Sequence, residues 1–417
     1  MGWRSGLVRV ASASIQRGVR AALVSCACVA WAGASHADDA FVDASNLPVE
    51  IHGFVSQGFI KSTKNDYLAA SERGSFEFAE VGFNLTKELA DNLQAGMQLF
   101  AHDLGPLGNY SPQFDWFYLD YRWQDWLGLR AGRTKIPFGL FNEVNDIDAA
   151  RSPILLPQSI YPVDHREFLL AVTGGELYGD ISLGGAGALE YRAYGGTLFI
   201  DTPAPPAPGI SVLDFSVPYA FGGRLMWSTP LDGLRVGASG QDLRFDATYG
   251  FSPEVLAALQ GVMLLPADLA GPLPVKFRVP RWVASLEYSA HDVDVAVEYS
   301  RWTGDFESRA PLIFPPHTVN ERYYAMGSYR VSSWFTPGLY YSVLYPNIRD
   351  REGRAQHQHD LAVFFRYDLM ANWLLKLEGH LMRGTAALDN KSLNDGVPPA
   401  QLPPNWALLL IKTTAYF

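Results

Sequence analysis

Apolar and polar residues alternate along this chain in many separate segments. From Leu93 to Ala101, and again from Val293 to Tyr299, apolar side chains hold every second position. Because successive side chains of an extended chain point to opposite sides, each segment is predicted to be a strand with one apolar and one polar face. Sixteen such segments are centred near residues 55, 80, 97, 119, 130, 174, 193, 224, 239, 285, 297, 327, 342, 364, 378 and 412. The chain is therefore expected to be all-β.

The connections between these segments are tight and long in turn. Tight ones include "WQDW", "SAHD" and "LMAN", and the long ones are "KSTKNDYLAASERG" and residues 138–167, 201–216, 246–275, 304–320 and 385–404. Short turns at one rim and long loops at the other are typical of outer-membrane barrels, because only one rim faces the periplasm. Residues 49–417 are predicted to form a transmembrane antiparallel β-barrel of about sixteen strands, with short periplasmic turns and long extracellular loops.

The chain ends on "NWALLLIKTTAYF", in which alternate positions from Ala407 to Phe417 are mainly apolar. In hydrocarbon every backbone polar group must be satisfied internally, so the last strand of a barrel must pair with the first. Tyr416 and Phe417 are predicted to end that strand at the membrane interface, where aromatic side chains are favoured. The alternative, a soluble all-β protein, stays open because aromatic residues also fill the cores of sandwiches.

The first 37 residues differ in composition from the rest of the chain. Four arginines precede the apolar stretch "AALVSCACVAWAGA", and a small-x-small site ends at Ala37. This order is typical of a cleavable signal peptide, which leaves residues 38–48 as a short periplasmic segment. The alternative of lipid attachment at Cys26 conflicts with the short apolar stretch before it. Because Cys26 and Cys28 are the only cysteines, no disulfide or thiolate site is expected in the mature chain.

The charge of the chain argues against one class of partner. The formal net charge is -10, and loss of the leader with its four arginines would change it to -14. Without a basic patch, nucleic-acid binding is not expected.

One long connection contains the segment "SPEVLAALQGVMLLP", residues 252–266. Ser252 is suited to the N-cap, Pro253 to the first helical position and Pro266 to termination. We predict a short helix that packs over the barrel mouth.

Two segments resemble Gram-negative outer-membrane porins. The stretch "RAGRTKIPFGLFN", residues 130–142, is similar to sixteen-stranded porins of the phosphate-selective porin O and P type and related general porins, and Phe417 resembles their barrel-assembly signal. The resemblance implies a homotrimer of water-filled channels, without a cofactor, through which small hydrophilic solutes and ions diffuse passively. It also implies export by the Sec machinery, insertion by the barrel-assembly machinery, and contact with lipids and lipopolysaccharide in the cell outer membrane. The chain departs from a phosphate-selective pore in having few lysines.

The resemblance further implies that the third outer loop, residues 138–167, folds inward and narrows the channel. Loops of this length in compact proteins are usually functional or disordered, and charges at a constriction set ion preference. We predict a constriction formed by Arg130, Asp146, Asp148, Arg151, Asp164 and Arg166, in which the loop charges face wall arginines such as Arg130. The predicted pore wall, taken from the polar parity of the strands, comprises Asp120, Arg192, Arg224, Arg235, Asp294, Glu298, Arg330, Arg366, Lys376 and Glu378.

In the strand near residue 130, the sequence does not decide which side chains face the interior of the barrel. Arg130 shares its parity with Gly128 and Gly132, whereas Arg133 and Lys135 fall on the lipid parity. The last two reach the interior only if a bulge near Gly132 shifts the phase. Otherwise they lie at the rim and extend their charged ends into water.

No catalytic motif stands out, so the protein is not expected to be an enzyme. The patterns G-x-S-x-G and H-E-x-x-H are absent. His357 and His359 share a strand parity, but two histidines are a weak metal signal, and no metal is predicted. Two alternatives to a porin stay open, a non-conducting structural or adhesive barrel and an outer-membrane barrel hydrolase. A charged interior can be closed by salt bridges, so conductance separates the porin from its main rival.

Overall fold

The computed structural model describes residues 49–200, 205–389 and 392–417. The predicted leader and the predicted periplasmic segment, residues 1–37 and 38–48, lie outside the described residues. Strands make up most of the described chain. They are β1 (Val49–Ser62), β2 (Phe78–Ala90), β3 (Leu93–Leu104), β4 (Gln113–Gln124), β5 (Leu127–Lys135), β6 (Ala171–Ser182), β7 (Ala188–Thr197), β8 (Ile210–Ser228), β9 (Leu234–Phe251), β10 (Leu273–Arg278), β11 (Arg281–Ala290), β12 (Val293–Ser308), β13 (His317–Tyr329), β14 (Phe335–Tyr345), β15 (Gln358–Met370), β16 (Trp373–Gly384) and β17 (Asn405–Tyr416).

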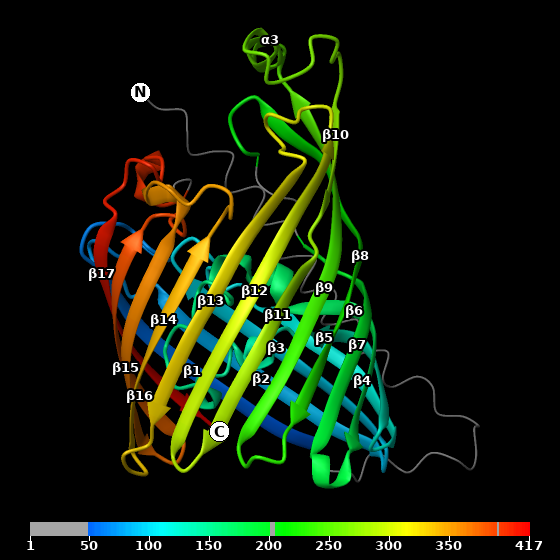
Figure 1. The fold of residues 1–417 in the computed structure, drawn as a ribbon, viewed down its shortest axis with the longest axis vertical. Coiled ribbons are helices and arrows are strands. Elements are labelled where there is room, and N and C mark those ends of the chain that lie inside the picture. The colour runs from blue at the N-terminus through cyan, green and yellow to red at the C-terminus, as the bar shows by residue number, and fades with distance from the viewer. Residues whose placement is uncertain (1–48, 201–204, 390–391) are drawn as a thin grey trace, which may run out of the picture. The chain divides into compact units, whose positions relative to one another are not determined.

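These strands form one antiparallel sheet that closes into a barrel of sixteen strand positions (Figure 1). β10 and β11 each pair with both β9 and β12, so the two segments occupy one position in the ring. β1 pairs with β2 on one side and with β17 on the other. Each predicted segment coincides with one position, which confirms the predicted fold class.

The last residue of the chain completes the ring. Gly53 and Phe417 exchange two backbone hydrogen bonds of 3.0 Å each, beyond the ladder in which Phe54 lies opposite Tyr416. The Phe417 ring lies against Gly53, where an added Cβ would stand 2.6 Å from Cζ. The predicted pairing of the last strand with the first is thus confirmed.

The two faces of each strand have different surroundings. In β15, Leu361, Val363 and Phe365 are exposed on the outer face, whereas Ala362 and Phe364 are buried on the inner face. An outer belt of exposed apolar side chains is what a hydrocarbon environment favours. The alternation seen in the sequence therefore separates the outside of the barrel from its interior.

Helical segments are short and lie in the connections. They are η2 (Asn142–Val144), η3 (Asp148–Ala150), η4 (Val163–His165), α2 (Arg166–Leu169), η5 (Gly184–Ala186), α3 (Pro253–Gly261), η6 (Arg354–Gln356) and η7 (Asn394–Gly396). In the part of the chain that the structure describes, no helix is both long and apolar enough to cross a membrane.

Helix α3 begins as the sequence predicts but packs elsewhere. Ser252 caps it, because its Oγ accepts a hydrogen bond from the Val255 N–H. The predicted packing over the barrel mouth is wrong. Leu256 and Leu259 instead contact a small apolar cluster on β9, β10 and β12, where these strands project beyond the rim (Figure 1).

Strands β8, β9, β10 and β12 extend further than the sequence predicts. They take up parts of three predicted loops, residues 201–216, 246–275 and 304–320. Stacked rings on adjacent strands stabilise the extension, since the ring centroids of Phe245 and Phe277 are 5.9 Å apart and those of Phe277 and Phe306 are 4.0 Å apart. Alternation alone did not reveal these cross-strand pairs.

Strand β5 contains one position that glycine alone suits. Gly132 has a φ of +135°, and a Cβ on it would lie 2.4 Å from the carbonyl oxygen of Phe117. The pairings of β5 with β4 and β6 keep their register through Gly132, so no bulge lies there. Lys135 nevertheless reaches the interior from the end of the strand, where its Nζ is 3.3 Å from Asp146 Oδ2.

We predict that Gly132→Ala lowers the free energy of unfolding by about 1–3 kcal/mol, because the substitution forces a strained backbone or a shift of β4. Urea unfolding of the barrel in detergent, followed by tryptophan fluorescence, measures this difference. Gly185→Ala is the matched control, since a Cβ at Gly185 meets nothing within 4 Å. Equal stability of the two variants would contradict the assignment of strain to Gly132.

Candidate functional site

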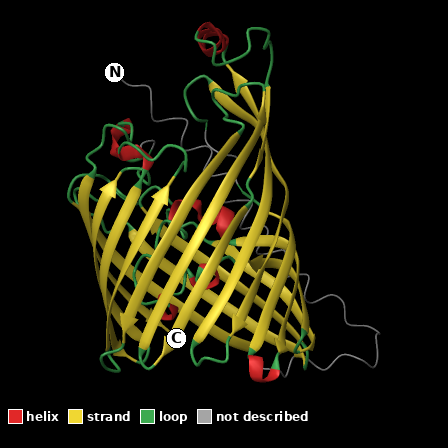
Figure 2. Ribbon diagram, viewed as in Figure 1, coloured by secondary structure: helices red, strands yellow, loops and turns green. Residues whose placement is uncertain are grey.

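The connection between β5 and β6, residues 136–170, crosses the interior of the barrel. Ser159 Oγ lies 2.8 Å from Ser342 Oγ on β14, and the Ser159 carbonyl accepts a hydrogen bond of 3.0 Å from Arg322 on β13. β14 is eight positions from β5 in either direction around the ring. Figure 2 shows the short helices of this connection between the front and back walls. We call residues 136–170 the inner loop. It reaches β14, on the side of the barrel opposite β5, the strand that precedes it.

A buried carboxylate fixes the middle of the inner loop to β16 and β17. Asp148 Oδ2 lies 2.8 Å from Lys412 Nζ, and its Oδ1 lies 3.6 Å from Lys376 Nζ. Thr414 Oγ1 donates a further hydrogen bond of 2.7 Å to Asp148. Both lysines are fully buried. Removing one partner from a buried ion pair typically costs about 3–5 kcal/mol, so this contact holds the loop strongly.

Wall residues also hold the backbone of the inner loop. Lys376 Nζ donates to the carbonyl oxygens of Asp148 and Arg151, both at 2.8 Å. Arg366 Nη1 donates to the carbonyl of Ala149 at 2.8 Å, and Glu378 accepts the backbone N–H of Leu155 at 3.2 Å. Three predicted wall residues therefore bind the inner loop.

A second cluster of charges fixes the inner loop to β4 and β5. Arg166 lies between two carboxylates, since it forms ion pairs with Asp115 and, at 3.1 Å, with Asp146. Lys135 completes the cluster from the end of β5. Asp115 falls where the register between β3 and β4 shifts, so this irregularity turns its side chain inward.

The third cluster is a row of alternating charges along the inner wall. In order the row contains Asp120, Arg130, Glu176, Arg192, Glu143, Arg224 and Glu190. Arg130 Nε lies 2.7 Å from Asp120 Oδ2, and Arg224 Nη1 lies 2.8 Å from Glu143 Oε2. Arg130 was expected to face the loop acids Asp146 and Asp148, but its ion pairs are with neighbouring strands. Glu143 is a loop carboxylate that does meet wall arginines, Arg192 and Arg224.

Apolar side chains complete the contact between the inner loop and the wall. Phe138 and Tyr161 are buried in a cluster that includes side chains of β7, β8, β9, β11, β12 and β13. The hydroxyl of Tyr161 donates to Glu298, which also accepts a hydrogen bond of 2.9 Å from Tyr324 and one of 3.0 Å from the Leu140 N–H. The interior is therefore partly filled rather than fully open.

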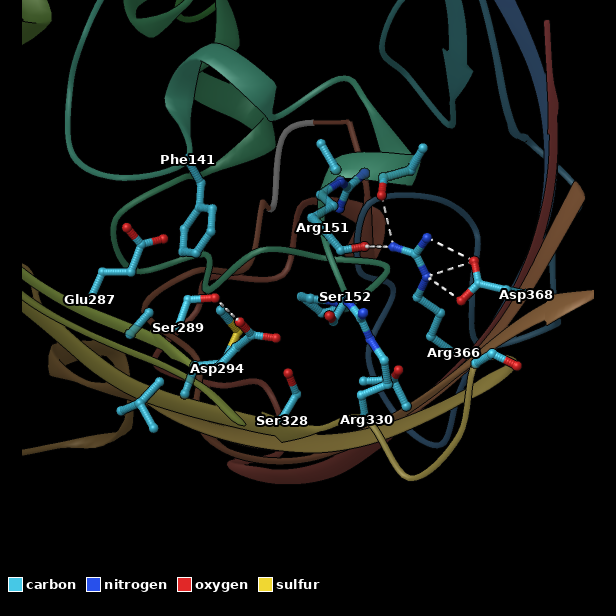
Figure 3. A pocket seen from close by; sticks show the side chains of 18 residues that line it. Phe141, Arg151, Ser152, Glu287, Ser289, Asp294, Ser328, Arg330, Arg366 and Asp368 are labelled. Carbon is cyan, nitrogen blue, oxygen red and sulfur yellow. Dashed lines mark hydrogen bonds and ion pairs between the residues drawn. The ribbon is translucent and has the colours of Figure 1, made fainter. Parts of the chain in front are cut away.

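Cavities remain on both sides of the inner loop. One of about 400 Å³ lies toward the short turns and is lined by Asp294, Arg330 and Arg366 among others (Figure 3). Arg366 also pairs with Asp368 at 2.8 Å across this cavity wall. Toward the long loops lie cavities of about 350 and 310 Å³. A further cavity, where the inner loop meets β2 and β3, has a volume of only about 30 Å³.

Of the remaining predicted residues, Asp164, Arg235 and Tyr416 lie apart from these clusters, whereas Arg151 belongs to the first one. Asp164 is 2.9 Å from His165 Nδ1 and borders the outer cavity of about 350 Å³. Arg235 pairs with Glu287 at 3.1 Å near the short turns. Arg151 pairs with Asp148 at 3.0 Å within the loop. Tyr416 donates its hydroxyl to the Ala371 carbonyl at 2.8 Å in a short turn.

Sequence reasoning missed several residues that the structure brings into these clusters. Glu143 lies in the predicted loop but was not singled out, and Lys412 lies on the polar parity of the last strand. Parity could have found Lys412 and Glu176. Asp115 could not be found that way, because a register shift determines where its side chain points. His359, weighed as a metal ligand, hydrogen bonds with the Tyr341 hydroxyl at 2.7 Å.

Two carboxylates of the inner loop, Asp146 and Asp148, are held in their charged form. Burial alone would raise the pKa of Asp148, but the ammonium groups of Lys412 and Lys376 outweigh it and hold that pKa well below its ordinary value. Burial likewise opposes ionisation of Asp146, whose pKa Arg166 and Lys135 together hold well below the usual range. Both aspartates therefore stay charged across the physiological pH range.

No protein-family model matches the chain, and a search of curated proteins finds no match. Solved structures do match. OmpT of Vibrio cholerae is 11% identical with a TM-score of 0.56, covering 91% of this chain and 100% of that chain. An anion-selective porin from Comamonas acidovorans is 13% identical with a TM-score of 0.55, covering 89% and 100%. Salmonella typhi OmpF, in a complex with daunomycin, is 12% identical with a TM-score of 0.54, covering 91% and 100%.

The chain has the fold of a Gram-negative outer-membrane porin. At these identities the similarity concerns the fold alone, so the function of this porin-like barrel has to be argued from its own interior.

We predict that the inner loop stays anchored over a wide pH range. A carboxyl group whose pKa is depressed in the folded state stabilises that state above its unfolded pKa, and this stabilisation is lost only as the pH falls through the lower folded value. Hydrogen exchange of the amides of residues 148–155, corrected for intrinsic rates, should therefore show constant protection as the pH falls from about 7 to about 4.5.

Asp148→Asn should reduce this protection at every pH, because it removes the charge that Lys376 and Lys412 share. Asp125→Asn is the control, since the side chain of Asp125 is 95% exposed in a short turn. Protection in the wild type that disappears below about pH 6 would contradict the depressed pKa values of the two loop aspartates.

Proposed function

We propose that this protein is an outer-membrane porin of narrow bore, through which small hydrophilic solutes and ions diffuse down their gradients. The observation that carries the proposal is the polar interior. A closed barrel whose inner wall bears a row of alternating charges contains cavities of about 400 and 350 Å³ on the two sides of the inner loop. A wall of this kind suits water and ions, and its charges would set ion preference.

We further propose that the inner loop forms the constriction. Its ion pairs with three parts of the wall support a rigid eyelet rather than a mobile flap. The charges that keep some exposure there, such as Arg130 and Glu143, would act directly on a passing ion. The remaining loop charges would act by holding the loop in place.

The same proposal includes the location of the protein, its assembly and its oligomeric state. The exposed apolar belt supports insertion in the outer membrane among lipids and lipopolysaccharide, after export with the leader and insertion by the barrel-assembly machinery. Tyr416 and Phe417 would serve as the assembly signal. A homotrimer is proposed, and one matched structure, OmpT of Vibrio cholerae folded in vitro, is described as a trimer form. The proposed activity is diffusion without catalysis or a cofactor.

One observation favours a second candidate, a non-conducting structural barrel. The inner loop contacts inward-facing side chains of strands all around the ring, and many of these contacts are buried. Such packing reduces the open area and would close the barrel if no continuous path remained.

Single-channel recording in planar bilayers under a salt gradient separates the two candidates. The wild type should give stepwise currents of small amplitude with a defined reversal potential. Lys376→Gln combined with Lys412→Gln should raise the conductance by about twofold or more, because the buried partners of Asp148 are lost and the middle of the loop is released from β16 and β17. Lys276→Gln, at an exposed position of β10, is the matched control. Folded wild-type barrels that carry no current, even after many insertions, would favour the structural candidate.

A further inference from the structure

One cavity in the outer half of the barrel has a composition unlike that of the charged clusters. Its volume is about 310 Å³, and it lies between helix α2 and strands β9 to β13. Phe168, Phe245, Phe277 and Trp302 supply aromatic surface, and two arginines, Arg281 and Arg322, also line the cavity. This aromatic cavity, as we call it, therefore combines apolar surface with concentrated positive charge.

The two arginines lack the partners that other inner-wall arginines have. Arg281 and Arg322 are only 4% and 7% exposed. Among the described residues, neither has a carboxylate oxygen within 4.0 Å, whereas Arg130, Arg192, Arg224 and Arg366 each form an ion pair with a wall or loop carboxylate. Burying a cation with no carboxylate in direct contact is costly, so an anion that entered here would be stabilised.

Neutral groups position the two guanidinium groups without cancelling their charge. Arg281 Nη2 donates to the Phe168 carbonyl at 2.7 Å, and Arg322 Nη1 donates to the Ser159 carbonyl at 3.0 Å. Arg281 also contacts the side-chain oxygen of Gln241. Its Nε has no hydrogen-bond acceptor in the described part of the chain. This unsatisfied buried donor adds to the cost of leaving part of the guanidinium group without an acceptor.

Trp302 holds both arginines against one ring. The Cζ of Arg322 is 3.7 Å from the centroid of the Trp302 ring, and that of Arg281 is 5.0 Å away. Cation–π contacts of this kind orient a guanidinium group but leave its outer N–H donors available. Two cations that repel each other are thus kept together beside Trp302 in the cavity wall.

Phenyl rings form another part of the cavity wall. Phe168 meets Phe245 edge-on at 5.3 Å, and Phe245 is stacked with Phe277 at 5.9 Å between centroids. Aromatic surfaces bind a flat apolar body by stacked or edge-to-face contact. The volume falls at the lower end of the range for small-molecule sites, which suits a compact ligand.

We propose that the aromatic cavity binds a small aromatic carboxylate. The carboxylate would receive hydrogen bonds from Arg281 and Arg322, whose fork geometry matches it, and the ring would lie against Phe245 and Phe277. The proposal rests on the porin function in one respect, because it names a class of solute that the barrel would admit. Binding itself does not require conduction.

Isothermal titration of the full refolded barrel in detergent tests this site, with benzoate as the probe. Benzoate should bind saturably, whereas acetate, which lacks the ring, and benzyl alcohol, which lacks the charge, should each bind at least tenfold more weakly. Equal heats from benzoate and benzyl alcohol, or from benzoate and acetate, would overturn the proposal.

Variants locate the binding site. Arg281→Gln and Arg322→Gln should each weaken benzoate binding at least tenfold. Because both arginines also hold the inner loop, Phe277→Leu provides a second test, since it removes a ring of the wall and should weaken binding several-fold. Arg309→Gln is the control, because Arg309 pairs with Asp268 on an exposed outer loop. Unchanged affinity in all three cavity variants would overturn the proposal and leave the arginines a purely structural role.

Conductance of the same preparations separates this proposal from the porin function. Benzoate binding by barrels that carry no current would support the cavity and contradict the proposed channel. Current without saturable benzoate binding would support the channel and contradict the cavity.

Discussion

A strand inside hydrocarbon has no water to satisfy its backbone N–H and C=O groups, and the rest of this structure depends on how the chain meets that constraint. The sheet closes because β1 pairs with β17, and the final hydrogen bonds join Gly53 to Phe417. Closure gives every strand an inside and an outside. Alternate residues of each strand then face outward and form the apolar belt. The residues between them face inward and include the charges that hold the inner loop.

Buried charged side chains inside this barrel have two kinds of partner, either opposite charges or neutral groups. Asp148 with its two lysines, and Arg166 with its two aspartates, are paired and hold a loop of 35 residues across the lumen, from 136 to 170. These pairs are costly to desolvate, so their value lies in fixing one position of the loop rather than in net stability. Arg281 and Arg322 are held by carbonyl groups and Trp302 instead. The contrast is the reason to regard their cavity as a binding site.

Much of the architecture could be predicted because the membrane imposes a period of two on the sequence. Parity identified Lys376, Glu378 and Arg366 as inward-facing residues, and the structure places them there. Parity could not reveal their partners, which lie on a loop whose path depends on tertiary contacts. It also failed at Asp115, where a shift in register turns the side chain inward. The strand extension beyond the rim depends on the Phe277–Phe306 contact, which joins residues 29 positions apart in sequence.

The central claim is that the inner loop crosses the lumen and contacts β14. Ser159→Cys combined with Ser342→Cys tests it directly, because the two Oγ atoms are 2.8 Å apart and Cys26 and Cys28, the natural cysteines, precede the barrel. The account predicts that mild oxidation joins the pair in folded barrels and leaves the single-channel conductance unchanged. Ser56→Cys with Ser342→Cys, on inward-facing positions four strands apart, should stay unlinked. Thiols that remain free in the first pair would contradict the account.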